Sequence, residues 1–137
     1  MTTTDDMLRS HPGDLAPLDE GALARCVEAC LACAQACVAC ADACLSEPDD
    51  VVPALRACIR LTQDCADFCT AAARAVSRQT GADHTVLRAV LRACVTICGA
   101  CARECETHAG RHDHCRVCAE QCRAGEKACQ DLLDTLP

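Results

Sequence analysis

The sequence predicts an all-α protein: an antiparallel up-down-up-down four-helix bundle with a cysteine-lined core and a short N-terminal arm. Cysteine accounts for 17 of the 137 residues. The cysteines recur at steps of three and four, and short segments containing proline or glycine separate four such runs. Because these steps place side chains on one face of a helix, each run predicts one helix with a stripe of sulfur.

The first and longest stripe predicts a helix near residues 19–45. Its cysteines step 4, 3, 4, 3 and 4, an unbroken pattern of a and d heptad positions. The residues between them are mostly good helix formers, and Asp19 is the expected N-cap. The cysteines of this stripe are Cys26, Cys30, Cys33, Cys37, Cys40 and Cys44.

Three further stripes predict the remaining helices of the bundle. Pro53 fits the first turn of the second helix. Gly81 is the expected C-cap of that helix, and Asp83 is the expected N-cap of the next one. Since the connections are short, neighbouring helices should be antiparallel. The expected ranges are 50–79, 83–109 and 112–134.

These three stripes carry the other cysteines. Thr62 and Gly125 occupy positions at which the ladder lacks a sulfur. Residues 1–18 are expected to form an arm or a short helix, and residues 19–137 the cysteine-rich four-helix bundle. The cysteines of the three stripes are Cys58, Cys65, Cys69, Cys94, Cys98, Cys101, Cys105, Cys115, Cys118, Cys122 and Cys129.

Folding the helices back on one another predicts two different ends. His108 and His112 should lie near Cys44 at an open mouth, where they would meet incoming metal ions, whereas His114 should be a solvated neighbour. Aliphatic side chains should fill the opposite end, namely Leu23, Val76, Leu87 and Leu133. The same folding puts cysteines of the first two helices level in pairs: Cys37 with Cys58, Cys30 with Cys65, and Cys26 with Cys69.

Charge and composition exclude several classes of partner. The formal charge is −7, so nucleic acid and anionic membranes are poor partners. The apolar runs look too short for a transmembrane helix, and residues 1–6 lack the pattern of an export signal. We therefore expect a cytoplasmic protein whose thiols are free and available to soft metal ions.

Copper(I) suits these thiols better than zinc does. Side chains three or four residues apart on a helix have Cβ atoms about 5–6 Å apart, which allows two thiolates to hold one small soft ion. Zinc prefers four ligands in a closed tetrahedral site. On the order of one monovalent ion per thiolate would neutralise a loaded core, whereas divalent ions would leave an excess of positive charge. The expected cargo is several copper(I) ions per chain.

With these stripes, the chain resembles the bacterial four-helix copper storage proteins over about residues 19–134. The resemblance implies storage of many copper(I) ions inside the bundle, association into homotetramers, and a copper chaperone or efflux protein as donor or acceptor. The chain is most similar to the cytosolic branch of that family, because it shows no leader and carries histidines at the expected mouth. The expected metal ligands are all seventeen cysteines together with His108 and His112.

Two other functions stay open at this point. A thiol-based zinc or cadmium buffer would use the same ligands, and a redox sensor would use one or two thiols of low pKa near basic groups. An enzyme is not expected. The sequence has no Ser-His-Asp, carboxylate-dyad or phosphate-loop pattern, and a bundle filled with thiols leaves no substrate cavity.

Overall fold

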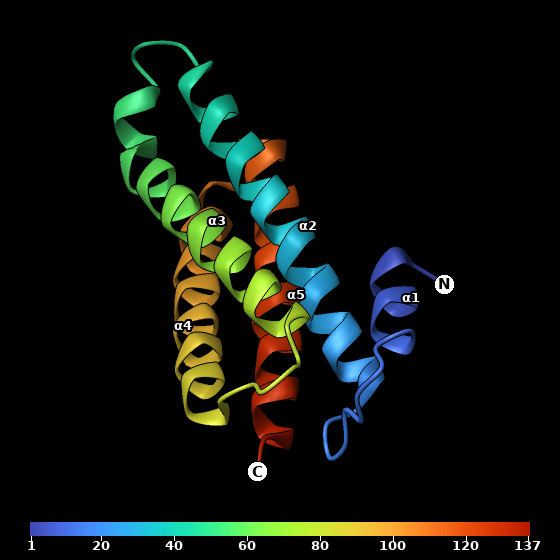
Figure 1. Cartoon of the computed structure of the whole chain (residues 1–137). Coiled ribbons are helices and arrows are strands. Elements are labelled where there is room, and N and C mark those ends of the chain that lie inside the picture. Colours follow the sequence, from blue (N-terminus) through green and yellow to red (C-terminus); the bar gives the residue numbers. More distant parts are fainter.

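The computed structural model describes residues 1–137, and all its regular elements are helices (Figure 1). Four long helices form the bundle, and the short helix α1 lies beside the N-terminal half of α2. Both α2 and α4 pack against α3 and α5, so the four helices enclose one core. The predicted all-α four-helix fold is confirmed. The elements are α1 (Thr3–Arg9), α2 (Glu20–Leu45), the 3₁₀ helix η1 (Val52–Leu55), α3 (Arg56–Ser77), α4 (His84–His108) and α5 (Asp113–Thr135).

Aspartate caps begin two of the long helices where the sequence predicted them. The Asp19 carboxylate accepts a hydrogen bond from the Ala22 backbone N–H at 2.9 Å at the start of α2. The Asp83 carboxylate accepts from the N–H groups of Thr85 at 2.8 Å and Val86 at 3.3 Å at the start of α4. Each cap satisfies N–H groups that have no partner within the helix, a contribution of about 1 kcal/mol.

The second long helix starts later than the sequence predicted. α3 begins at Arg56 rather than near residue 50, because a loop and η1, with Pro53 in its first turn, come first. Gly81 was also assigned the wrong role. α3 ends at Ser77 with Arg78 as its C-cap, and Gly81, whose φ is 64°, lies in the connection that follows.

The late start of α3 corrects the predicted levels of its cysteines. Residues 46–55 are used in the connection, so each α3 residue lies nearer the mouth than in a helix that starts at residue 50. Cys58 Sγ lies 3.5 Å from that of Cys105, one turn nearer the mouth than predicted. Cys65 Sγ lies 3.7 Å from the Cys33 sulfur. The three predicted pairs are therefore wrong: each α3 cysteine lies about one helical turn nearer the mouth than predicted.

Aliphatic side chains fill the end of the bundle where α2 and α4 begin, as predicted. α5 contributes Leu132, which is fully buried, instead of the predicted Leu133, which is only partly buried. Leu132 follows Cys129 by three residues, so it faces the same side of the helix. The buried residues of this closed end are Leu23, Val76, Leu87, Leu91 and Leu132.

The arm before α2 packs at this closed end. Leu8 of α1 is buried against the core. The hydroxyl of Thr2 donates a hydrogen bond to the Glu28 carboxylate on α2. His11 Nε2 lies 3.2 Å from Thr80 Oγ1 in the connection between α3 and α4. These contacts attach the arm both to α2 and to the connection between α3 and α4.

Helices α2 and α4 correct the expectation that the apolar runs are too short for a transmembrane helix. By length and composition alone, α2 and α4 could cross a membrane. Alanine and cysteine supply much of this apolar character. In the bundle, the cysteines of both helices are buried in the shared core, as expected for core helices of a helical bundle.

Candidate metal centre

All seventeen cysteines are free thiols inside the bundle. None of them has more than 1% of its surface exposed. Their steps of three and four turn every sulfur toward the bundle axis. The core is therefore a column of sulfur rather than a set of disulfide crosslinks.

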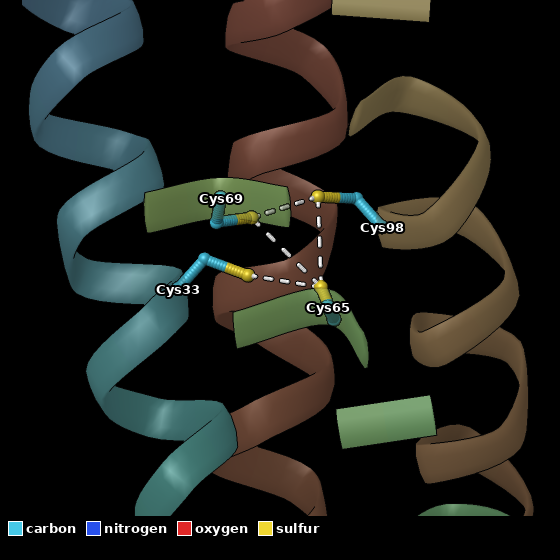
Figure 2. Close-up of side chains that lie close together, drawn as sticks. All are labelled: Cys33, Cys65, Cys69 and Cys98. Atoms are coloured by element: carbon cyan, nitrogen blue, oxygen red, sulfur yellow. Dashed lines mark hydrogen bonds between the residues drawn. The ribbon is translucent and has the colours of Figure 1, made fainter. Parts of the chain in front are cut away.

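One group of four sulfurs lies in the inner part of this column (Figure 2). The Sγ atoms of Cys65, Cys69 and Cys98 form a triangle with sides of 3.9, 3.8 and 3.4 Å. The Cys33 sulfur lies 3.7 Å from that of Cys65, and all four lie within 4.8 Å of one another. Three thiolates at this spacing can hold one soft ion, and the fourth can bridge to the next ion.

A second group of four sulfurs lies on the mouth side of the first. The Sγ atoms of Cys37, Cys118 and Cys122 form a triangle with sides of 3.7, 4.0 and 3.6 Å, and Cys101 completes the group. The Cys33 sulfur lies 3.9 Å from that of Cys37 and 3.7 Å from that of Cys122. Cys33 therefore joins the second group to the first.

The sulfur column continues to the closed end without a break. The Cys129 sulfur lies 3.4 Å from that of Cys30 and 3.7 Å from that of Cys26. From Cys26 to Cys118, no step between neighbouring sulfurs exceeds 4.0 Å. The sulfurs along this path belong to Cys26, Cys129, Cys30, Cys94, Cys98, Cys65, Cys33, Cys37 and Cys118.

At the mouth, His114 completes a mixed group that the sequence analysis missed. Its Nδ1 lies 3.4 Å from Cys40 Sγ, 3.6 Å from Cys115 Sγ and 4.0 Å from Cys44 Sγ. The ring is therefore a possible metal ligand rather than a solvated neighbour. The available signal was its spacing, because His114 precedes Cys118 by four residues and continues that stripe by one turn.

A single carboxylate holds two of the mouth histidines. Glu47 Oε1 lies 3.0 Å from His112 Nδ1 and 3.1 Å from His114 Nε2. Hydrogen bonds from the two imidazoles, that of His114 above all, lower the pKa of the Glu47 carboxyl. When His114 Nε2–H donates to Glu47, its Nδ1 lone pair is free to face the sulfurs. Glu47 was not singled out in the sequence because a lone glutamate after a helix carries no metal signal.

The structure gives the two histidines predicted for the mouth different surroundings. His112 contacts Glu47, as described above, and its ring centroid is 5.5 Å from that of His114. His108 Nε2 lies 3.4 Å from the Glu104 carboxylate on the same helix. Both rings are part-buried at the mouth, and both are held by carboxylates rather than by thiols.

Burial and neighbouring thiols shift the acidity of the cysteines in opposite directions. At the mouth, burial raises the pKa of Cys44 to about 11 and also raises the pKa of Cys115. At the closed end, hydrogen bonds from Cys129 and Cys30 lower the pKa of Cys26 to about 5. A thiolate at Cys26 is stabilised by S–H groups that donate to it, and those neighbouring thiols must stay protonated. Only part of the column can therefore ionise without metal. Cations would allow the rest to ionise in a core with little water.

Comparison with known sequences identifies the family. The family model described as copper storage protein matches residues 19–134 of the chain. The chain belongs to the copper storage protein family. This confirms the resemblance that the cysteine stripes predicted, and the matched residues include every one of those stripes.

The chain is similar to known proteins along most of their length. The copper storage protein Ccsp from Streptomyces lividans, loaded with 10 copper equivalents, is 60% identical with a TM-score of 0.95, over 98% of this chain and 100% of that one. A structure of copper loading to a cytosolic copper storage protein from the same organism, with five coppers, is 63% identical with a TM-score of 0.81, over 83% and 93%. The uncharacterized cysteine-rich protein YhjQ of Bacillus subtilis (strain 168) is 37% identical over 106 residues, 72% of this chain and 91% of its own length.

Proposed function

We propose that this chain stores copper(I) in the cytosol by holding many ions on the thiolates of its bundle core. The observation that carries this proposal is a column of three-sulfur triangles that share edges. The Cys69–Cys98 edge, 3.4 Å long, belongs to one triangle with Cys65 and to another with Cys94. Shared sulfurs suit a soft monovalent ion that accepts two or three thiolates, so successive triangles can fill with bridged copper(I).

The role is storage rather than catalysis or zinc buffering. Divalent ions on shared sulfurs would leave an excess of positive charge in a buried core, which is costly. The family of the chain implies a non-enzymatic role. The solved relatives are described as loaded with 10 copper equivalents and with five coppers, which supports the same cargo here.

The proposed ligands are all seventeen cysteines together with His114. We propose that His108 and His112 meet ions at the mouth and pass them inward. The store occupies residues 19–137, and residues 1–18 serve as an arm outside it. A copper chaperone or an efflux protein is the proposed donor or acceptor, because free copper(I) would be captured by other thiols before reaching a buried site.

We also propose that the chain forms homotetramers. An apolar stripe on the outer face of α2 supports association: Leu31, Val38 and Leu45 are 50%, 62% and 59% exposed and recur every seven residues. Light scattering should then give about four times the chain mass of 14.4 kDa. Val38→Glu should lower the measured mass without changing helix content. A measured mass equal to that of one chain in the unsubstituted protein would contradict the tetramer.

Copper capacity is the test of the storage function. Reduced protein should be titrated with copper(I) without oxygen, in the presence of a competing ligand, and read by native mass spectrometry and by loss of alkylatable thiols. The expected end point is on the order of one ion per thiolate. Saturation at two to four ions, or zinc bound in preference to copper(I), would contradict storage and favour discrete tetrahedral sites.

A further inference from the structure

Gly125 interrupts the sulfur stripe of α5 at a buried position. It lies between Cys122 and Cys129, inside α5. Glycine in a helix interior is less favourable than alanine by about 1 kcal/mol. Gly125 lies within a continuous helix and does not have a positive φ, so the backbone conformation does not explain why this position lacks a side chain.

The missing side chain leaves space beside two sulfurs. A Cβ atom added at Gly125 would lie 3.3 Å from Cys98 Sγ and 3.7 Å from Cys33 Sγ, and 3.5 Å from the Cβ of Cys33. In Figure 2, α5 passes behind these sulfurs, while the four thiols come from α2, α3 and α4. At Gly125, the part of this group that faces α5 is therefore lined by backbone instead of by a side chain.

This space lies where the two inner sulfur groups meet. Cys33 belongs to the first group, with Cys65, Cys69 and Cys98, and its sulfur lies 3.9 Å from that of Cys37 and 3.7 Å from that of Cys122 in the second group. An ion held by Cys33 and Cys98 on the α5 side would lie against Gly125. A methyl group there would fill the space that such an ion needs, because protein cores are too closely packed to absorb it freely.

We propose that Gly125 keeps open a copper(I) position between Cys33, Cys65 and Cys98, at the junction of the two inner sulfur groups. This inference rests on the proposed storage function. Copper stays in the +1 state on binding, each ligand thiol releases its proton to solvent, and sulfur–copper bonds replace the S–H bonds. Gly125 itself binds nothing and acts as a positioning residue that leaves room for the ion.

The test compares Gly125→Ala with Gly99→Ala. Gly99 is next to Cys98 in α4, but a Cβ there would meet the carboxylate of Glu126, which is the flexible end of a side chain. Copper(I) titration by native mass spectrometry should show about one ion fewer per chain for Gly125→Ala. The Gly99→Ala protein should bind as many ions as the parent. Circular dichroism of the two reduced apoproteins should show equal helix content.

A full copper load in Gly125→Ala would overturn the inference, and so would an equal loss in Gly99→Ala. A parent chain that binds no copper would instead overturn the storage function. Cys33→Ala provides a second route if Gly125→Ala folds poorly, because it removes the Cys33 sulfur, which would lie 3.7 Å from the added Cβ. Adding Gly125→Ala to Cys33→Ala should then cause no further loss, since the ion has already lost a ligand. Losses that add in full would show that Gly125 acts elsewhere.

Discussion

The two ends of the bundle close the same core with opposite chemistry. At the mouth, Glu47 and His114 lie over the last thiols, and these groups are part-buried and polar. At the closed end, Leu23, Leu91 and Leu132 have no exposed surface. One end offers nitrogen, oxygen and sulfur donors to an arriving ion, whereas the other offers only aliphatic carbon.

This difference gives the sulfur column a direction. An ion that arrives at the mouth meets imidazole and carboxylate before it meets the inner triangles. An ion at the closed end would have to cross buried leucines without a ligand, which is unfavourable for a charged species. Stability and metal uptake should therefore depend on different ends of the same helices.

The largest effect should come from the closed end and should be on stability. Leu91→Ala removes a fully buried side chain, and such changes cost about 2–5 kcal/mol. Urea unfolding of the reduced apoprotein, followed by circular dichroism, measures this loss. Copper capacity in native buffer should stay the same, because Leu91 offers no ligand.

Val86→Ala is the control for this loss. It lies in the same helix near the same end but is 58% exposed, so stability should change by about 0.5 kcal/mol or less. If Leu91→Ala lowered copper capacity without lowering stability, the closed end would contribute to metal binding, and the proposed separation of stability from metal uptake would be wrong.

The next effect should separate rate from capacity. Cys40→Ala/Cys115→Ala at the mouth should slow copper uptake about tenfold, equivalent to about 1.4 kcal/mol at the first binding step. Cys26→Ala/Cys129→Ala at the closed end should leave the initial rate unchanged and remove about one or two ions from the final count. Stopped-flow uptake followed by native mass spectrometry measures both quantities. Equal slowing by the two pairs would mean that ions also enter at the closed end.

The sequence predicted the closed end better than it predicted the mouth. Helical spacing determines which residues face the core, so Leu23 and Val76 could be placed from the sequence alone. Leu132 replaced Leu133 because both lie near the core face, and spacing cannot separate neighbours at its edge. The N-caps at Asp19 and Asp83 were also predictable, since their signals are local.

The mouth depended on features that the helical period does not contain. The length of the connection before α3 sets the level of Cys58 and Cys65, and a 3₁₀ turn has no clear signature in composition. Glu47 lies in that connection, so its position against His112 and His114 results from the chain reversal. The ring of His114 faces the thiols because α5 begins at Asp113, one residue before His114, and first-turn side chains lean back toward the helix start.

The structure therefore predicts a ranking among the mouth histidines. His114→Ala should slow uptake about tenfold, because its Nδ1 faces three thiols and its loss removes a first ligand. His108→Ala/His112→Ala should slow both loading and unloading by a smaller factor, with nearly the same final capacity. Stopped-flow uptake from a weak copper(I) donor measures these rates. Slower uptake in the double variant than in His114→Ala would overturn this ranking and make His108 and His112 the main entry residues.

The smallest effect should come from Glu47→Gln, which acts on the mouth without removing a ligand. The amide oxygen carries no charge and accepts hydrogen bonds more weakly than a carboxylate does, so His114 should lose part of its orientation. Uptake should slow a few-fold, consistent with a weakened charge-assisted hydrogen bond. Nitrogen-15 NMR of the apoprotein should show a change in the His114 ring tautomer, and Glu47→Asp should restore the parent signal in part. Glu104→Gln, which changes the partner of His108 instead, should leave the His114 signal unchanged. A normal tautomer with slow uptake in Glu47→Gln would mean that the carboxylate attracts ions by its charge rather than by holding His114.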